Sequence, residues 1–262
     1  MLRVASLHIY PVKACAGISV EVMDLDSQGP VGDRRFMIVD PDGRFITQRE
    51  EPALALVRPT WSADGLRLEA PGLTPITVEA GETRRRVQVW RSELEAVDAG
   101  DEAADWLSTK LNRLVRLVAM APDVRRPIDA PHGQGPTSVA FADGFPLLVT
   151  HAASLRELNG RLDEPVGMDR FRANIVIEGG APWEEDGWRG LRIGDAEIAL
   201  PKPCERCKVV TVDPQTGATS REPLRTLATY RCVTGAGVIF GQNGVHAAPA
   251  TIEVGDDAEP LD

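Results

Sequence analysis

Short apolar segments separated by glycine and proline are the feature that most constrains the fold of this chain. Its 262 residues include 24 glycines and 20 prolines, spread over the whole length. In the first half, β-type runs lie between these turn formers at 6–10, 36–39, 66–69 and 86–90. An Asp-Gly pair at 42–43 follows one such run and is typical of a β-hairpin turn. The first half is therefore predicted to form a small β-barrel or sandwich.

A few helices interrupt this β-rich pattern. They are expected at 101–111, 150–162 and 223–230. The sequence offers Asp101 and Thr150 as N-caps and Pro223 as a first-turn residue. Strands of the second half are expected at 141–149, 174–178, 191–193, 197–200 and 209–213. The chain is thus predicted to be mainly β with a few helices, in the α+β class.

A loose segment at 121–137 divides the chain. It contains Pro122, Pro127, Pro131 and Pro136 together with two glycines, which is typical of a linker. A length of 262 residues suits one large or two small domains. We therefore predict two lobes, an N-terminal β-barrel domain at 1–121 and a second β-barrel domain at 122–262.

Charge and cysteine content restrict the partners and the compartment. The net charge is −10 and the pI is about 5.0, which disfavours general binding to nucleic acid. The N-terminus lacks the apolar core of a secretory signal, and no stretch has the length of a membrane helix, so no membrane partner is expected. Four cysteines are too few for disulfides to stabilise a chain of this length. A reducing compartment is the simplest setting for such a chain, so a cytoplasmic location is expected.

Two cysteines three positions apart, Cys204 and Cys207, enclose Arg206. A thiolate is a soft ligand for a redox-active metal, and a guanidinium can fork onto an anion, so the motif suggests a cofactor with both a metal and a phosphate. Half of a zinc site also fits the spacing, but no second Cys/His pair follows at the usual distance. A thioredoxin-type pair needs a helix after the motif, where a strand is expected here. Two ordinary core cysteines remain the alternative.

Further segments carry groups that suit such a ligand. Lys13 follows Pro-Val and precedes small residues and a glycine, as in a tight loop that presents an ammonium. Arg35 lies in a Gly-Asp-Arg-Arg run, and Arg172 and Asn174 share one side of an expected extended segment. Asn243 lies in an expected glycine turn. Taken alone, each also fits an exposed surface cation or an ordinary loop residue.

The order of these segments is more specific than any one of them. The sequence contains, in turn, YPVK (10–13), GDRRF (32–36), TQRE (47–50), FADGFPLLV (141–149), FRANIV (171–176), PCERCKVVTVD (203–213), PQTG (214–217) and FGQN (240–243). This series resembles the MOSC family, named for the C-terminal domain of molybdenum-cofactor sulfurase, over about residues 7–254. The similar subgroup has an N-terminal β-barrel domain and includes mitochondrial amidoxime-reducing components and bacterial proteins that detoxify N-hydroxylated bases.

The resemblance implies a molybdenum cofactor (Mo-molybdopterin) bound between the lobes, with Cys207 as the protein ligand of the metal and the catalytic residue. The residues that match cofactor-binding positions are Lys13, Arg35, Arg172, Asn174, Arg206 and Asn243. It also implies an oxidoreductase that reduces N-hydroxylated compounds: hydroxylamines, amidoximes or N-hydroxylated bases. Since the chain has no glycine motif for a dinucleotide and no iron–sulfur cysteine set, the electrons are expected from a separate flavin- or haem-type protein.

The chain departs from the family pattern at Ala14, Gly144, Phe145, Glu205 and Asn243. Relatives carry hydroxyl residues at the first three positions, a serine at the fourth and a tyrosine at the fifth. If backbone amides make those contacts, little changes. A sulfur-transfer or cofactor-carrier protein without its own turnover is the main alternative, with a zinc-binding module as the third.

Overall fold

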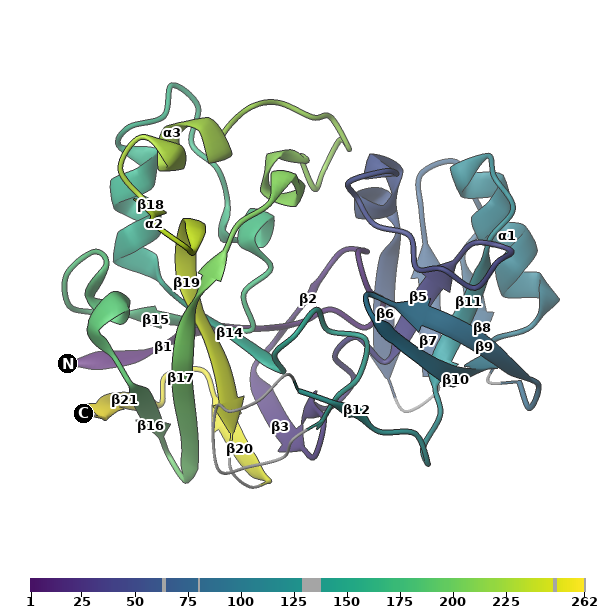
Figure 1. Cartoon of the computed structure of the whole chain (residues 1–262), viewed down its shortest axis with the longest axis horizontal. Helices are drawn as coiled ribbons and strands as arrows, with labels where there is room; N and C mark the ends of the chain where they lie inside the picture. Colours follow the sequence, from purple (N-terminus) through teal and green to yellow (C-terminus); the bar gives the residue numbers. More distant parts are fainter. Residues whose placement is uncertain (63–64, 80, 129–137, 247–248, 262) are drawn as a thin grey trace.

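The chain forms two β-rich lobes that lie side by side, as Figure 1 shows. The computed structural model describes residues 1–261 except 63–64, 80, 129–137 and 247–248. Strands dominate both lobes, and the three α-helices of the described residues lie at the periphery. The predicted mainly β, two-lobed architecture is confirmed.

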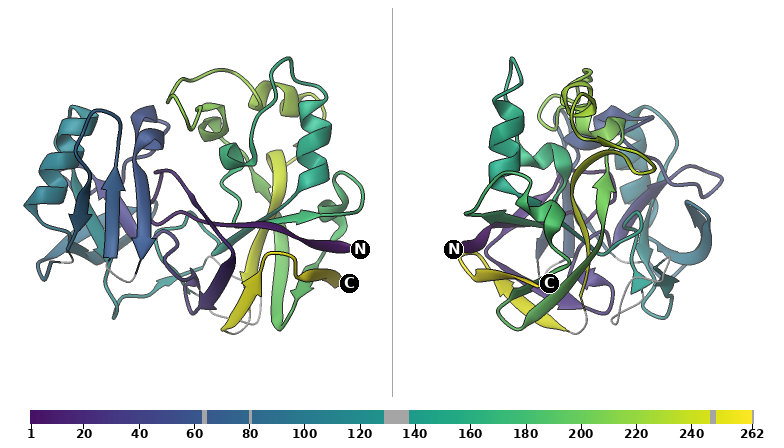
Figure 2. Two further views of the ribbon diagram at one scale, coloured as in Figure 1. Left: turned by 180° about the vertical axis from the view of Figure 1, so that it is seen from behind. Right: turned by 60° about the vertical axis from the view of Figure 1, so that its left-hand side comes forward.

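The first lobe is a closed barrel. In pairing order its strands are β14 (Leu147–His151), β15 (Ile175–Glu178), β1 (Leu2–Ile9), β21 (Asp257–Leu261), β16 (Gly190–Ile193), β17 (Ala196–Glu205) and β19 (Gly237–His246). Antiparallel pairing of β19 with β14 closes the ring. Two short strands attach to it, β2 (Ile18–Val20) on β1 and β18 (Cys232–Val233) on β19. Because β1 pairs with β21, the two chain ends lie together at one end of this barrel lobe (Figure 2).

Alternating burial explains why these segments form a barrel. Along the first half of β17, Ile198 and Leu200 are buried while Glu197 and Ala199 face solvent. This period of two is the pattern of a strand with one face on a core. Leu7, Ile177, Leu191 and Ile198 are among the fully buried side chains of the barrel core. Each such side chain contributes about 1.5–3 kcal/mol on leaving water.

The second lobe consists of two small sheets and a helix. One sheet has the order β5 (Phe36–Val39), β11 (Arg116–Met120), β10 (Ser92–Asp98) and β9 (Arg84–Val89). The other contains β6 (Arg58–Ser62), β7 (Gly65–Glu69) and β8 (Ile76–Val78). Helix α1 (Asp101–Leu111) and the 3-10 turn η1 (Pro52–Leu56) enclose a core with Leu66, Leu107 and Leu117. The pairings of the described residues do not close this lobe into a ring.

The chain crosses between the lobes early. After β1, the segment 10–16 leaves the barrel, and its Val12 and Cys15 are fully buried in the core of the second lobe. The chain then returns to the barrel as β2. Each lobe is therefore built from more than one stretch of sequence. The predicted division into 1–121 and 122–262 stays a prediction, but β1 and β2 pair with strands from the later part of the chain.

Smaller elements complete the fold. They are β3 (Val22–Asp26), β4 (Gly29–Pro30) and β20 (Ala250–Glu253) in one sheet, the pair β12 (Arg126–Pro127) and β13 (Ser138–Val139), and the 3-10 turns η2 (Met168–Phe171), η3 (Glu184–Gly187) and η4 (Lys208–Thr211). Most of the predicted linker, 129–137, lies outside the described residues. None of the helices among the described residues has the length and apolarity needed to cross a membrane.

Several local predictions were wrong at the ends of elements. Helix α2 (Ala152–Asn159) is capped by His151, whose Nδ1 accepts from the Ala153 amide, rather than by Thr150. Residue Gly100 precedes α1 without a side-chain cap, so Asp101 is a first-turn acid that favours the helix dipole. Helix α3 (Leu224–Ala228) follows Pro223 as predicted but is shorter.

Two segments near the predicted site also differ from expectation. The apolar run 209–213 was predicted as a strand, but it contributes to η4, because Val210 is buried among Phe171 and Leu227 rather than paired with a strand. The predicted glycine turn at 240–245 lies inside the long strand β19. In both cases tertiary packing overrides the local pattern.

Candidate functional site

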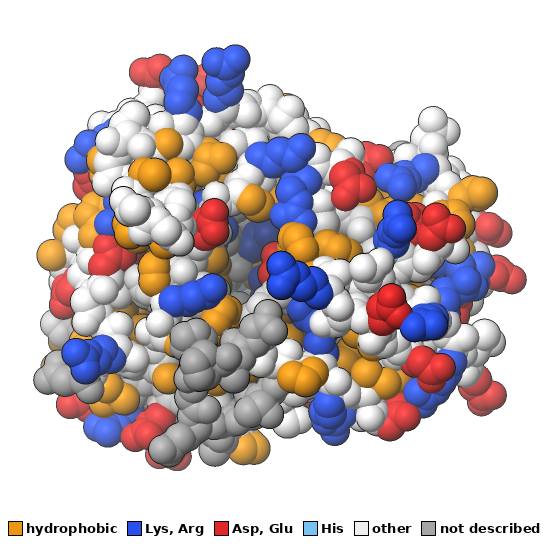
Figure 3. All heavy atoms as spheres, in the orientation of Figure 1, with side chains coloured by type: hydrophobic (Ala, Val, Ile, Leu, Met, Phe, Trp, Pro, Cys, Tyr) orange, Lys and Arg blue, Asp and Glu red, His pale blue; other side chains and the backbone are white. Residues whose placement is uncertain are grey.

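A cavity lies between the two lobes, where Figure 3 shows a hollow edged by Lys and Arg side chains. Its volume is about 910 Å³, including the open space at its mouth. The predicted site residues that line it are Lys13, Arg172, Asn174, Arg206, Cys207 and Asn243. Segments far apart in the sequence thus meet at one place. The exception is Arg35, whose neighbour Arg34 lines the cavity instead.

The two thiols of the Cys-x-x-Cys motif differ in exposure. Cys207 is exposed and precedes η4, with its Sγ 3.7 Å from Nη1 of Arg49. Cys204 is half-buried, and its Sγ accepts from Nη1 of Arg206 at 3.0 Å. Cys207 is therefore the thiol with room for a further ligand. Within the described part of the chain, no group of three or more His, Cys, Asp or Glu side chains could hold a metal ion, so the zinc alternative lacks a ligand set.

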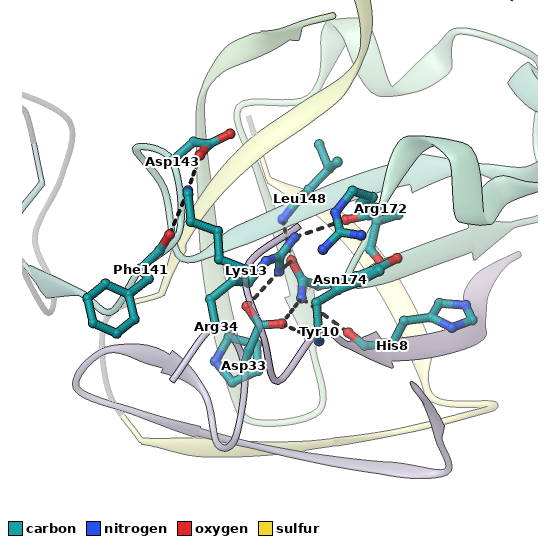
Figure 4. Close-up of polar contacts among 12 residues, drawn as sticks. His8, Tyr10, Lys13, Asp33, Arg34, Phe141, Asp143, Leu148, Arg172 and Asn174 are labelled. Carbon is teal, nitrogen blue, oxygen red and sulfur yellow. Dashed lines mark hydrogen bonds and ion pairs between the residues drawn. The ribbon is translucent and has the colours of Figure 1, made fainter. Parts of the chain in front are cut away.

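Lys13 lies deep in the cavity wall. It is 6% exposed, and its Nζ donates to the carbonyl of Phe141 at 2.8 Å (Figure 4). The ammonium also pairs with Asp143, whose side chain is 71% exposed at the rim. Burial lowers the pKa of Lys13, and the Asp143 carboxylate opposes that shift. A buried ammonium whose acid partner can turn to solvent is suited to accept a second anion.

Arg34 is a site residue that the sequence did not single out. Its Nη1 donates to Asp33 at 2.5 Å and to Oδ1 of Asn174 at 3.1 Å (Figure 4). Asp33 is buried and also accepts from the Tyr10 amide at 2.7 Å. Asn174 donates to the carbonyl of His8 and accepts from the Leu148 amide, both at 3.1 Å. Its amide is therefore fully used in holding the cavity wall together.

The guanidinium of Arg172 is half-buried, and it contacts a backbone carbonyl and an aromatic ring. Its Nη1 donates to the carbonyl of Cys15 at 2.5 Å, and its guanidinium lies 4.3 Å from the centre of the Tyr10 ring. Arg34 lies over the same ring at 4.4 Å. Burial, followed by the charge of Arg34, lowers the pKa of Arg172. Arg34 pairs with the buried carboxylate of Asp33, whereas within the described structure Arg172 forms no ion pair, and this excess of positive charge suits the binding of an anion.

Arg206 adds an unused donor. Its Nη2 donates to the carbonyl of Phe171 at 2.7 Å, but its buried Nε has no hydrogen-bond partner within the described structure. Buried donors are rarely left unpaired in proteins, so an orphan of this kind at a cavity indicates a missing acceptor. We call Lys13, Arg34, Arg172, Asn174 and Arg206 together the inner wall.

Unusual backbone conformations gather around this cavity. Ala14, Arg34 and Arg172 have φ values of 67°, 47° and 57°, and all three line it. Trp90, at φ 54°, donates from its indole to Asp143 at 3.1 Å. Left-handed backbone is costly for residues other than glycine and concentrates at functional sites. For Arg172, the prediction of an extended segment was wrong, because η2 ends there in a left-handed turn.

Arg35 points away from the cavity. Its Nη2 donates to both carboxylate oxygens of Asp26, at 2.7 and 2.9 Å, and Nη1 contacts Gln28. The backbone turns at Arg34, so neighbouring arginines face opposite sides. The predicted role of Arg35 in binding the cofactor therefore has no support from its position, and Arg34 has the place expected of it. The sequence of two adjacent arginines does not by itself indicate which of Arg34 and Arg35 faces the cavity.

The departures from the family pattern all lie around the cavity. Ala14, Gly144, Phe145, Glu205 and Asn243 line it, and the carbonyl of Ala14 accepts from Gln48 Nε2 at 2.6 Å. Asn243 donates to the carbonyl of Pro203 at 3.1 Å. Further lining residues that received no predicted role are Thr47, Gln48, Arg49 and Asp143. The first three belong to the TQRE segment. The presence of this segment in the ordered series of motifs was the one feature of the sequence that could have pointed to them.

Comparison with known proteins agrees with this geometry. Two family models match, the MOSC N-terminal beta barrel domain over residues 1–113 and the MOSC domain over residues 136–259. Mitochondrial amidoxime-reducing component 1 of Mus musculus is 38% identical over 97% of this chain and 80% of its own length. The Homo sapiens protein of that name is 37% identical over 97% of this chain and 81% of its own length. Mitochondrial amidoxime reducing component 2 of Rattus norvegicus is 38% identical over 87% of this chain and 72% of its own length. The chain belongs to the MOSC family and matches both its N-terminal beta barrel domain and its MOSC domain, so the predicted resemblance is confirmed.

Proposed function

We propose that this protein is a molybdenum-dependent oxidoreductase that reduces N-hydroxylated compounds. The relatives that match nearly the whole chain are named amidoxime-reducing components, and an amidoxime is one such compound. The overall reaction converts N–OH, two electrons and two protons into N–H and water. The observation that carries the proposal is the exposed thiol of Cys207 at the mouth of a cavity whose inner wall has more cations than acids.

The residues of the cavity fit the molybdenum cofactor by their chemistry. Cys207 offers a single accessible thiol, the soft ligand that suits molybdenum. The buried Nε of Arg206 and the guanidinium of Arg172 are suited to bind an anion, which the phosphate of the pterin would supply. Lys13 would pair with the same phosphate. The bound cofactor supplies a two-electron redox centre; the protein supplies its position and electrostatic surroundings.

The inner wall is arranged to hold a ligand without reorganising. Lys13, Arg172 and Arg206 each donate to a backbone carbonyl, and Arg34 donates to the carbonyl of Arg172 at 3.3 Å. Donors fixed by the main chain lose little freedom when an anion binds. The substrate would enter at the exposed side of Cys207. A separate flavin- or haem-type protein would supply the electrons, and we propose a cytoplasmic location for this chain.

The test is benzamidoxime reduction by protein produced in a host that makes the cofactor. We expect turnover with dithionite-reduced viologen, and none with NADH or NADPH alone. Cofactor-loaded protein that leaves benzamidoxime unchanged with reduced viologen would support the carrier alternative instead. Turnover with NADH by the pure chain would show a nucleotide site and contradict the need for a separate donor.

A further inference from the structure

A second concave surface opens beside the thiol. It is lined by Gln48, Arg49, Glu50 and Pro52 of one lobe and by η4, α3 and the segment 219–225 of the other. Its volume is about 1280 Å³, including the space open to solvent. Gln48 and Arg49 line both this groove and the cavity, and Lys208 follows Cys207 directly. The groove therefore adjoins the cavity that Cys207 lines.

The charge of this surface is opposite to that of the whole protein. Its charged residues are Arg49, Lys208, Arg221, Arg225 and Glu50, four cations against one acid. The chain as a whole carries −10. We call this surface the basic groove. Such a local reversal attracts anions to one place on a molecule that otherwise repels them.

Two of the four cations are available to a ligand. Lys208 and Arg221 are exposed, and within the described structure their side chains make no hydrogen bond or ion pair. Arg225 shares the carboxylate of Glu222 at 2.6 Å. Arg49 lies over the Trp90 ring, 4.8 Å from its centre, with one nitrogen toward Cys207. The groove thus combines fixed and free cations within reach of one small molecule.

The floor of the basic groove is apolar. Pro52, Val212, Leu224, Ala228 and Val238 contribute to its lining. Val212 is buried, and Leu224 and Val238 are half-buried. An apolar floor with polar groups at the edge is typical of a small-molecule site, whereas protein partners usually meet on broader, flatter surfaces.

We propose that the basic groove is a substrate subsite that binds an anionic group, a phosphate or a carboxylate, of an N-hydroxylated compound whose reducible nitrogen reaches the Cys207 side. This inference rests on the proposed function and names its substrate class. The protein would favour charged substrates, such as N-hydroxylated nucleotides, over neutral ones. Removal of the free cations would abolish that preference and leave the reaction itself intact.

The test compares matched substrates with reduced methyl viologen as the donor. One pair is N4-hydroxycytidine 5′-monophosphate and N4-hydroxycytidine; the other is 4-carboxybenzamidoxime and benzamidoxime. We expect kcat/KM to favour the charged member of at least one pair by about tenfold, as for one charge-assisted contact. The two pairs distinguish a phosphate from a carboxylate as the preferred anion.

The variant K208A/R221A removes the two free cations, and K110A/R189A makes the same charge change elsewhere. Neither Lys110 nor Arg189 lines the cavity or the groove. We expect the preference to fall to near parity in the first variant and to persist in the second, with benzamidoxime kcat/KM unchanged in both. Calorimetric titration with cytidine 5′-monophosphate and cytidine gives a second readout that does not depend on turnover, and we expect the same loss of preference.

Equal kcat/KM for charged and neutral substrates in the unaltered protein would overturn the proposal, as would a preference that survives in K208A/R221A. If that variant slowed turnover only with a protein donor and not with viologen, the groove would be a donor-docking surface and the substrate proposal would be wrong. Failure of the proposed function itself looks different, because benzamidoxime would then not be reduced by any of these proteins.

Discussion

The inner wall and the basic groove are both rich in cations, yet they differ in how those cations are held. In the inner wall, Lys13 is buried and Arg172 is half-buried, and both side chains donate hydrogen bonds to backbone carbonyls. In the basic groove, Lys208 and Arg221 extend into solvent without partners in the described structure. A fixed set of donors suits one permanent ligand, whereas exposed side chains without partners suit a ligand that binds and is released. We therefore expect the inner wall to bind the cofactor and the basic groove to select the substrate.

The largest effect is expected at Cys207, where the two regions meet. Cys207→Ser should lower amidoxime reduction by more than about a hundredfold, since even residues behind a metal ligand cost 10–100-fold. The fold should persist, because this side chain is exposed. Cys204→Ser should be milder. Activity assays with circular dichroism check both; loss of activity in the reverse order would show that Cys204 is the ligand.

A smaller effect is expected from the inner wall itself. Arg172→Ala and Lys13→Ala each remove a charge-assisted contact to the cofactor, worth roughly 1.5–3 kcal/mol. Cofactor content should fall by about tenfold or more, while the melting temperature changes little because each variant also removes a buried charge. Molybdenum and pterin assays beside thermal unfolding measure both. Full loading of the two variants would contradict the assignment of the inner wall.

A substitution at Glu185 tests whether a buried ionisable side chain outside the cavity affects stability alone or also function. This carboxyl is fully buried outside the cavity, accepts from Ser154 Oγ at 2.8 Å, and burial raises its pKa to about 7. The raised pKa means that the folded state retains a proton which the unfolded state releases above about 4.5, so stability falls as pH rises from there to about 7. Glu185→Gln removes that penalty.

We therefore expect Glu185→Gln to stabilise the protein at pH 8 by on the order of 2 kcal/mol and to have little effect at pH 4.5. Cofactor content and turnover should not change. Urea unfolding at the two pH values measures the difference, with Glu164→Gln, on the exposed surface, as the control. An equal shift at both pH values would show that folding does not raise the pKa of Glu185.

The smallest effect is expected from substitution of Arg35. This residue is adjacent in sequence to Arg34 of the inner wall but belongs neither to the inner wall nor to the basic groove. Its pair with Asp26 is partly exposed, so Arg35→Ala should cost about 1 kcal/mol of stability. Cofactor content should equal that of the unaltered protein. A loss of cofactor as large as that of Arg172→Ala would restore the original prediction for this residue.

Much of the fold was predictable because it follows local rules. Helix α1 has its predicted bounds, since an apolar face with Ala103, Leu107 and Leu111 at helical spacing specifies it. The turn at 40–44 also forms as predicted, with the Asp40 amide donating to the Arg44 carbonyl at 2.9 Å. The closure of the barrel by β14 and β19 depends on contacts between residues almost a hundred positions apart, which local patterns do not encode.

The site was predictable as a set of segments but not in its detail. The ordered motifs singled out Lys13, Arg172, Arg206 and Cys207, and the structure brings these four residues to one cavity. They did not distinguish Arg34 from Arg35, because that choice depends on the left-handed backbone at Arg34. They also could not show the exposure that separates Cys204 from Cys207, which depends on the packing of Arg206 against Cys204.

The most direct test of the central claim is the metal and pterin content of the protein and of its Cys207→Ser variant, both made in a cofactor-competent host. Elemental analysis and pterin fluorescence are measured on the same samples. We predict molybdenum and pterin in equal amounts, close to one per chain for the unaltered protein, and a clear loss of molybdenum from the variant. Zinc in place of molybdenum, or equal molybdenum in both proteins, would contradict a cofactor held by Cys207.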